Sequence, residues 1–346
     1  MKLALITDAW RPQINGVVTT LQTVCEQLRA AGHTVETFTP DQFRNWACPS
    51  YPEIRLALGC GPKLRARLDE FQPDAIHIAT EGPLGLAARS YCKRRGLPYT
   101  SSFHTRFAEY IHLRTGLPLS LGYAFLRWFH GGSERLMTAT PTLLEELKTR
   151  GFGNPVLWSR GVDTELFRPR GKDFLPASRP VLLYTGRVAI EKNIEAFLKL
   201  DLPGTKYVVG DGPQREELER KYPEVRFVGY KHGEELARYL AAADVFVFPS
   251  LTDTFGLVML EALACGVPVA AFPVEGPKDV ILSSRVGCLD NDLKKAITEA
   301  LKLKPEDCRE YALRYSWRDC ALLFESYLAP ISKTASRATA WWQRYS

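Results

Sequence analysis

Short apolar strands alternate with helical segments in both halves of the sequence, and this alternation is the strongest constraint on the fold. KLALIT (2–7) is followed by apolar residues at helical spacing over 17–31, and then by HTVETFT (33–39). A strand, a helix and a second strand in that order form a βαβ unit with a parallel sheet. AIHIA (75–79) and YTSSFH (99–104) continue the pattern as further strands.

The same alternation restarts after residue 180. Strands are predicted at VLLYTG (181–186), 206–209, 225–228 and DVFVFP (244–249), with helices near residues 195, 217, 237 and 260 and a last helix near 307–328. The stretch 161–179 has two Pro, two Gly and little periodicity, which is typical of an interdomain join. We therefore predict an α/β fold of two doubly wound, Rossmann-like parallel-sheet domains. The first spans 1–168, the second spans 169–328, and the segment 329–346 packs back on the first.

Composition agrees with this architecture and excludes several classes of protein. The chain has 346 residues, of which 45% are hydrophobic and 24% charged, and this balance is ordinary for a globular protein of about two domains. The net charge of +6 is too small to indicate nucleic acid, and no RNP, KH or zinc-finger pattern is present. We expect no nucleic-acid partner.

Targeting and redox signals point to the cytoplasm. Eight cysteines are scattered without a C-x-x-C pair, which favours buried thiols over disulfides or a zinc site. The N-terminal segment MKLALITDAW has too few consecutive apolar residues for a signal peptide. No apolar run approaches the roughly 18 residues that a membrane-spanning helix needs. We expect a cytoplasmic protein, with any membrane contact peripheral.

Parallel sheets of this type bind ligands at the carboxyl ends of their strands, so the loops after strands are the candidate sites. The first such loop, DAWRPQING (8–16), has one glycine rather than G-x-G-x-x-G, which disfavours a dinucleotide site. Gly16 lets the backbone approach a phosphate or is an ordinary turn glycine. Asp8, at the end of its strand, is a candidate on the acceptor side, with helix capping as the alternative.

Two cations open the helix that follows VLLYTG. Helix N-termini favour acidic residues, because the helix dipole is positive there, so Arg187 and Lys192 run against the preference. A diphosphate bound between the two cations would resolve the conflict. The alternative is a solvated pair with Glu191 as its local partner.

The segment LTDTFGLVMLEALACG (251–266) is the most informative one. Asp253 lies where a helix begins, and Glu261 follows eight residues later on the apolar stripe of that helix, next to Leu257, Val258, Ala264 and Cys265. A buried carboxylate is costly unless hydrogen-bond donors satisfy it. A ribose diol would supply two such donors; an internal hydrogen bond to the backbone or to a distant Arg is the alternative.

His104 ends the YTSSFH strand, which would place it at the crevice between the domains. A lone histidine is more often structural than catalytic, but a position at the end of a strand favours a functional role. VVGDGP (208–213) is a glycine turn that needs no ligand to explain it.

Together these segments resemble the retaining glycosyltransferases of family 4, which have the GT-B fold of two Rossmann-like domains facing a cleft. The resemblance extends over nearly the whole chain and is specific in combination. It rests on DAWRPQINGVVTTL, SFHTRFAEYI, SRGVDTELFRP, GRVAIEKN, VVGDGP and DTFGLVMLEALACGVPV. The chain is particularly similar to the branch of bacterial lipid mannosyltransferases and sulfoquinovosyl- or glucosyl-diacylglycerol synthases.

The resemblance implies a role for each matching residue. The family's two carboxylates eight apart fall on Asp253, where the family usually has Glu, and on Glu261, which would bind the nucleotide ribose. Arg187 and Lys192 would hold the diphosphate, and His104 would lie beside the transferred sugar. The remaining donor contacts would come from the backbone at Gly16, Phe255, Gly256 and Leu257, and from Tyr230 and Lys231 next to the base.

The mechanism implied is retaining transfer without a metal or other cofactor. Arg187 and Lys192 would neutralise the leaving group, and the donor's own phosphate oxygen would act as base. The expected reaction moves mannose from GDP-mannose to a lipid such as diacylglycerol or a glycosyl-diacylglycerol. A UDP-sugar donor is the alternative. A non-catalytic nucleotide-sugar-binding subunit is a different class, and the missing glycine fingerprint disfavours a dehydrogenase.

The excess positive charge lies in the first domain. Residues 1–170 hold 21 Lys and Arg against 15 Asp and Glu, whereas residues 171–346 hold 24 of each kind. Lys63, Arg65 and Arg67 alternate with apolar residues, and LPLSLGYAFLRWF (117–129), which includes Trp128, is aromatic and apolar. Both stretches suit an anionic membrane surface at the inner face of the cell membrane. A solvated basic helix and a core helix are the alternatives.

Overall fold

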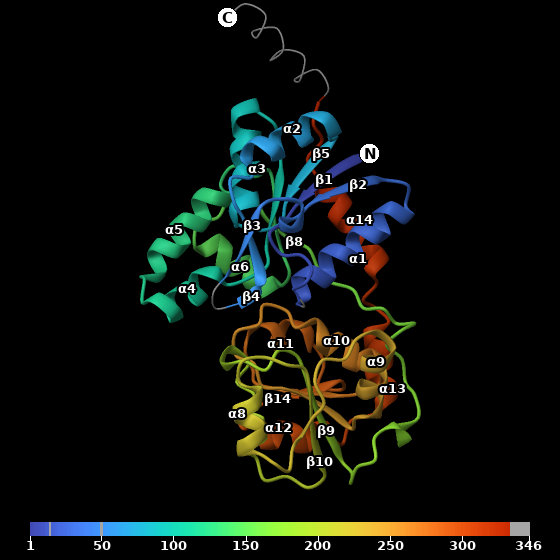
Figure 1. Cartoon of the computed structure of the whole chain (residues 1–346). Helices are drawn as coiled ribbons and strands as arrows, with labels where there is room; N and C mark the ends of the chain where they lie inside the picture. Colours follow the sequence, from blue (N-terminus) through green and yellow to red (C-terminus); the bar gives the residue numbers. More distant parts are fainter. Residues whose placement is uncertain (14, 49–50, 333–346) are drawn as a thin grey trace, which may run out of the picture. The chain divides into compact units, whose positions relative to one another are not determined.

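The computed structural model describes residues 1–13, 15–48 and 51–332. The chain divides into two compact units, Met1–Ser159 with the segment that starts at Arg318, and Arg160–Trp317. Each unit is built on a six-stranded parallel sheet with helices on both faces (Figure 1). The predicted fold class, two doubly wound α/β domains, is confirmed.

The N-terminal sheet has its first strand inside the sheet. Its order is β2 (Thr34–Phe38), β1 (Lys2–Ile6), β5 (Ala75–Ile78), β6 (Thr100–Phe103), β7 (Leu136–Thr138) and β8 (Pro155–Leu157). A separate antiparallel hairpin joins β3 (Asn45–Cys48) and β4 (Tyr51–Ala57). The helices are α1 (Gly16–Ala30), α2 (Gly61–Phe71), α3 (Pro83–Arg95), α4 (Phe107–Thr115), α5 (Leu119–His130), α6 (Pro141–Thr149) and α14 (Trp317–Tyr327).

The two faces of this sheet are covered by different helices. Side chains alternate along β1 and β5, so every second residue points to the same face. One face packs against α2, α3 and α5 in a buried cluster that includes Ala4, Ile6, Ile76, Ile78, Leu64, Leu84 and Phe129. On the opposite face His77 meets Phe324 of α14 edge to face, with ring centroids 4.8 Å apart.

The C-terminal sheet also has six parallel strands, and its first strand also lies inside the sheet. Its order is β11 (Arg226–Phe227), β10 (Thr205–Val209), β9 (Val181–Thr185), β12 (Val245–Phe248), β13 (Val269–Ala271) and β14 (Gly287–Leu289). Its longer helices are α8 (Arg215–Lys221), α9 (Gly233–Ala242), α10 (Leu257–Ala264), α12 (Leu293–Ala300) and α13 (Pro305–Ala312); α7 (Glu195–Leu198) and α11 (Glu275–Val280) are short. This is the strand order of doubly wound nucleotide-binding domains.

The division between the units differs from the predicted 168/169. The chain enters the second unit at Arg160, because residues 162–167 are tied to α13 and the turn that follows it. The amide of Val162 donates to the carbonyl oxygen of Tyr315 at 3.0 Å, and the guanidinium of Arg309 donates to the carbonyl oxygens of Thr164 and Phe167. These hydrogen bonds attach residues 162–167 to the second unit, although the sequence of this stretch has the low periodicity of a linker.

The prediction of one helix over 307–328 is wrong. The segment forms α13 and α14, which are separated at residues 313–316 and belong to different units. α14 lies in the N-terminal unit, where the indole of Trp158 donates to the carbonyl oxygen of Cys320 at 3.1 Å. Beyond it, the amide of Ile331 donates to Asp74 at 2.7 Å, next to β5. Of the predicted segment 329–346, residues 333–346 lie outside the described residues.

Candidate active site

The loops at the carboxyl edge of the C-terminal sheet bring together most of the residues predicted to bind a donor. Strand β9 lies between β10 and β12, and β11 lies beside β10. Arg187 and Lys192 follow β9, Tyr230 and Lys231 follow β11, and the segment 253–261 follows β12. Because all six strands are parallel, these loops emerge at one edge.

Lys192 and Asp253 form an ion pair across two of these loops. Nζ of Lys192 lies 2.5 Å from Oδ1 of Asp253, and both side chains are partly buried. The turn that carries Lys192 is held by Asn193, which has a positive φ of 51° and whose side-chain Nδ2 donates to the carbonyl oxygen of Pro249 at 3.1 Å. Oδ2 of Asp253 is buried and makes no hydrogen bond within the described part of the chain. A cation and a carboxylate are thus fixed together where the diphosphate and sugar were predicted to bind.

The glycines of VVGDGP support the loop that carries Arg187. A Cβ at Gly210 would lie 1.8 Å from the carbonyl oxygen of Gly186, and one at Gly212 would lie 2.4 Å from that of Val188. The amide of Val188 donates to the carbonyl oxygen of Asp211 at 2.8 Å. The two loops therefore pack backbone to backbone, which explains these glycines without a ligand contact.

Glu261 of α10 is partly exposed as a residue, but its carboxylate reaches into the protein. Its Oε2 is buried and has no hydrogen-bond partner among the described residues. Burial raises the pKa of Glu261 from its ordinary value of 4.5 to about 7. The predicted burial is confirmed for Oε2, though not for the residue as a whole, and the cost of burying this oxygen indicates a missing donor. Its assignment to a ribose stays a prediction.

The turn before α10 depends on two glycines. Gly256 has a φ of 82°, and a Cβ there would lie 2.9 Å from the ring of Phe248. Gly276 of α11 donates its amide to the carbonyl oxygen of Asp253 at 3.3 Å, and a Cβ there would lie 2.6 Å from that oxygen. Gly276 was not predicted to support this turn, because the three-residue strand β13 before it was not predicted. The apolar run GVPVAAF followed by Gly–Pro was the available signal.

The loop after β11 presents an aromatic ring. Tyr230 is exposed and stacks on His232, with ring centroids 6.1 Å apart and an interplanar angle of 16°. Lys231, in contrast, pairs with Glu235, its Nζ lying 2.7 Å from Oε1. The amide of Gly210 donates to the carbonyl oxygen of Gly229, so this loop is joined to the one after β10. Tyr230 is available to stack on a base, and Lys231 is held by the protein.

Asp8 caps a helix of the N-terminal domain. Its Oδ1 accepts from the amide of Leu84 at 2.9 Å, and its Oδ2 accepts from the amide of Gly85 and the hydroxyl of Thr80. Burial raises the pKa of Asp8 to about 6. These are the contacts of the capping alternative, at the start of α3. The predicted role of Asp8 on the acceptor side stays a prediction.

Two further predicted residues lie at loop ends of the same domain. His104 directly follows β6, is nearly buried, and meets Trp158 edge to face with centroids 5.8 Å apart. Gly16 is the first residue of α1, where the side chain of Asn15 accepts from the amides of Val17 and Val18 at 3.0 Å. Gly16 is exposed beside this cap.

The basic residues of α2 are less available than expected. Nζ of Lys63 donates to the carbonyl oxygen of Gln42 at 2.7 Å, and Arg67 pairs with Glu36 at 2.7 Å. Arg65 is exposed. The apolar stretch that was predicted to contact a membrane is more exposed. Trp128 of its helix α5 is exposed, and Arg89 stacks on the ring at 3.9 Å.

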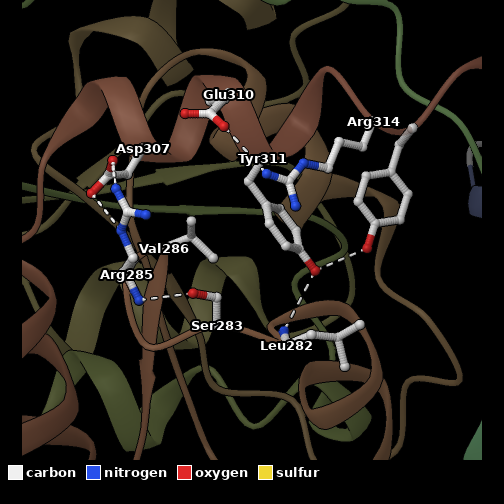
Figure 2. Close-up of a pocket in the computed structure, with 9 residues that line it drawn as sticks. Leu282, Ser283, Arg285, Val286, Asp307, Glu310, Tyr311 and Arg314 are labelled. Carbon is white, nitrogen blue, oxygen red and sulfur yellow. Dashed lines mark hydrogen bonds and ion pairs between the residues drawn. The ribbon is translucent and has the colours of Figure 1, made fainter.

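A pocket of the C-terminal unit lies away from these loops. Figure 2 shows Arg285 and Val286, which precede β14, together with charged and aromatic side chains of α13 and Arg314. Arg285 pairs with Asp307, Arg314 pairs with Glu310, and the hydroxyls of Tyr311 and Tyr315 lie 2.9 Å apart. Residues before β14 lie at the amino edge of the sheet, and the lining groups satisfy one another. We do not assign a ligand to this pocket.

Two further features are absent from residues 1–13, 15–48 and 51–332. Within these ranges no group of three or more His, Cys, Asp or Glu side chains is arranged to hold a metal ion. Nor does any helix there combine the length and the apolar character that crossing a bilayer requires.

Two Rossmann-like parallel-sheet domains are also the architecture of the GT-B glycosyltransferases. A solved sucrose-phosphate synthase from Thermosynechococcus elongatus has the same fold, with a TM-score of 0.75 over 94% of this chain and 97% of that one, at 24% identity. The model of Glycosyltransferase Family 4 matches residues 14–166, and that of Glycosyl transferases group 1 matches residues 179–303.

Two relatives define the family further. The chain is 31% identical to the GDP-mannose-dependent alpha-mannosyltransferase of Mycolicibacterium smegmatis, over 84% of each protein. It is 28% identical to the alpha-monoglucosyldiacylglycerol synthase of Streptococcus pneumoniae, over 90% of this chain and 81% of the relative. The chain belongs to glycosyltransferase family 4 and is a hexosyltransferase.

Proposed function

We propose that this enzyme transfers mannose from GDP-mannose to a hydroxyl of a membrane lipid, such as diacylglycerol or a glycosyl-diacylglycerol, with retention of configuration. The donor is suggested by the relative from Mycolicibacterium smegmatis, whose name specifies GDP-mannose. The acceptor is suggested by the relative from Streptococcus pneumoniae, a glucosyldiacylglycerol synthase. Because that relative transfers glucose, a UDP-hexose is the second candidate donor.

The observation that supports a nucleotide-sugar donor, whichever its base, is the unsatisfied carboxylate of Glu261. Its buried Oε2 lacks a donor among the described residues. A ribose diol brings two hydroxyl donors, so binding would remove the cost of burying this group. Tyr230 then offers a ring for the base, and the backbone at Phe255, Gly256 and Leu257 lies between the sugar and the phosphates in this assignment.

The ion pair explains how a diphosphate would be received. Lys192 forms an ion pair with Asp253. An entering diphosphate brings more negative charge than one carboxylate, so it would draw Nζ away and leave Asp253 to accept hydroxyls of the sugar. Arg187 and Lys192 would stabilise the leaving phosphate as the glycosidic bond breaks. The proton of the acceptor hydroxyl passes to that phosphate, and we propose that no metal takes part.

The acceptor domain would dock on a membrane through α5. Leu121 and Trp128 of this helix are 59% and 53% exposed, and aromatic and leucine side chains partition into the lipid interface. Exposed cations such as Arg65 would add attraction to anionic lipid. This docking would place the enzyme at the cytoplasmic face of the cell membrane.

A donor panel tests the proposal. The full chain is incubated with GDP-mannose, UDP-glucose or UDP-glucuronate and phosphatidylglycerol vesicles that contain diacylglycerol or glucosyl-diacylglycerol. A new glycolipid formed from GDP-mannose is expected, with an α-linkage in its NMR spectrum. Consumption of a UDP-sugar alone would replace the donor assignment, and the absence of any glycolipid would overturn the acceptor class.

A further inference from the structure

A buried histidine links the loop after β5 to strand β6 in the N-terminal domain. Nε2 of His130 lies 3.1 Å from Oε1 of Glu81, and Nδ1 lies 2.9 Å from Oγ of Ser101. The side chain of His130 is 1% exposed and that of Glu81 is 11% exposed. The rings of Phe129 and Phe103 pack on the imidazole, with centroids 4.9 and 6.2 Å away. Oε1 of Glu81 is thus held by an imidazole that is buried and packed between two aromatic rings.

The hydroxyls around His130 determine where its protons lie. Oγ of Ser133 donates to the carbonyl oxygen of His130 at 2.8 Å, and Oγ of Ser101 donates to Oγ of Ser133 at 3.0 Å. Each hydroxyl has one hydrogen, so Ser101 can only accept from Nδ1 of His130. One proton then lies between Nε2 and Oε1 of Glu81. Ser101 is buried and its hydrogen is already donated, so the trio is an anchor for Glu81 rather than a nucleophile and its base.

The backbone on either side of Glu81 is fixed as well. Asp8 binds both ends of this loop, through the hydroxyl of Thr80 and the amides of Leu84 and Gly85. A Cβ at Gly82 would lie 2.4 Å from Cγ of Asp8, and one at Gly85 would lie 1.9 Å from the carbonyl oxygen of Thr80. Neither glycine can be replaced without displacing the loop. The sequence TEGPLG therefore fixes the backbone on both sides of Glu81, and His130 holds one oxygen of its carboxylate.

Glu81 has an oxygen left to bind a ligand, and Asp8 does not. Both oxygens of Asp8 accept hydrogen bonds from the protein, whereas Oε2 of Glu81 forms none with the residues that the structure describes. Glu81 follows β5 by three residues, at the carboxyl edge where sheets of this type bind their ligands. We infer that Oε2 of Glu81 accepts a hydrogen bond from a hydroxyl of the acceptor, a glycerol or hexose headgroup; this inference rests on the proposed function for the class of acceptor.

Steady-state kinetics test the assignment with a matched control. Glu81→Ala should raise the acceptor KM about 10- to 100-fold, the loss of one hydrogen bond to a charged group, and change the donor KM less than about twofold. Glu81→Gln keeps an oxygen for His130 and should raise the acceptor KM less. Glu134→Ala is the control, because Glu134 is exposed and precedes β7, at the opposite edge of the sheet. An unchanged acceptor KM, or an equal rise in the donor KM, overturns the assignment.

A binding measurement keeps this test independent of the proposed donor and lipid. Saturation-transfer NMR is recorded on the full chain with methyl α-glucoside and with glycerol as probes, and with GDP as a reference ligand. Glu81→Ala and Glu81→Gln should weaken saturation of the probes and leave that of GDP unchanged, at unaltered melting temperature. The assignment fails if both probes bind the variants as well as they bind the wild type. It also fails if neither probe binds the wild type. If probe binding depends on Glu81 but GDP-mannose is not consumed, only the proposed donor fails.

Discussion

Nζ of Lys192 lies 2.5 Å from Oδ1 of Asp253, although 61 residues separate the two in the chain. Their loops follow the adjacent strands β9 and β12, so the order of strands in the sheet creates the pair. The ion pair thereby neutralises the cation in the turn after β9. The same cation becomes available when an anion of higher charge enters.

The role of Lys192 can be separated from that of an ordinary surface cation. Lys192→Met should lower kcat on the order of 10²- to 10³-fold, because the charge of the leaving phosphate loses its stabilisation. Lys199→Met, which removes an exposed cation of the same domain, is the control and should leave kcat within about twofold. Initial rates at saturating donor measure both effects. Loss of less than half the activity in Lys192→Met would exclude the assignment.

Glu261 should make stability fall with rising pH. Its pKa is about 7 in the folded protein against an ordinary 4.5, so folding retains a proton that the unfolded chain loses between these values. Glu261→Gln has no titrating group at this position, so its free energy of unfolding does not decrease for this reason. The free energy of unfolding of the variant should therefore gain on the wild type by up to about 3 kcal/mol between pH 4.5 and pH 7.

Urea denaturation at pH 5, 6, 7 and 8 measures this difference. Asp8, whose pKa is about 6, is present in both proteins, so its contribution cancels. A difference that does not vary with pH would show that Glu261 is not the group responsible. Addition of GDP should stabilise the wild type more than the variant if Glu261 binds the ribose.

Two glycine-to-alanine changes in helices should have opposite signs. Gly85→Ala should lower the free energy of unfolding by about 1–3 kcal/mol, because its Cβ would lie 1.9 Å from the carbonyl oxygen of Thr80. Gly61→Ala, at the start of α2, meets nothing within 4 Å and should be neutral or stabilising by up to about 1 kcal/mol. Chemical denaturation of both variants checks the pair. Equal effects would mean that the loop before α3 adapts freely.

Membrane docking should depend more on α5 than on α2. The double variant Leu121→Glu and Trp128→Glu should lower partition onto phosphatidylglycerol vesicles at least about tenfold, because both side chains are exposed and apolar. Lys63→Gln with Arg67→Gln should lower it about threefold or less, since both cations already bond to the protein. Flotation of each variant measures the partition. The reverse order would assign docking to α2.

The local pattern of the sequence was sufficient to predict many of the strands and the burial of one carboxylate. Periodicity predicted the strands that lead into the donor loops, and the apolar neighbours of Glu261 predicted that it is buried. The short strands β7, β8, β13 and β14 were not predicted, because three residues carry too little pattern. That omission concealed the contact of Gly276 with Asp253. The predicted helix over 307–328 failed because the chain changes domain at Trp317, which leaves no mark on local periodicity.

Pairings between distant residues were decided by the tertiary structure alone. The sequence determined that two α/β domains form, that glycines and charges gather after strands, and that Glu261 faces a core. It did not determine that Lys192 meets Asp253, that His130 anchors Glu81 across 49 residues, or that α14 completes the N-terminal domain. Periodicity depends on neighbours within a few residues, whereas these contacts depend on which strands lie side by side, and the packing of each whole domain sets that order.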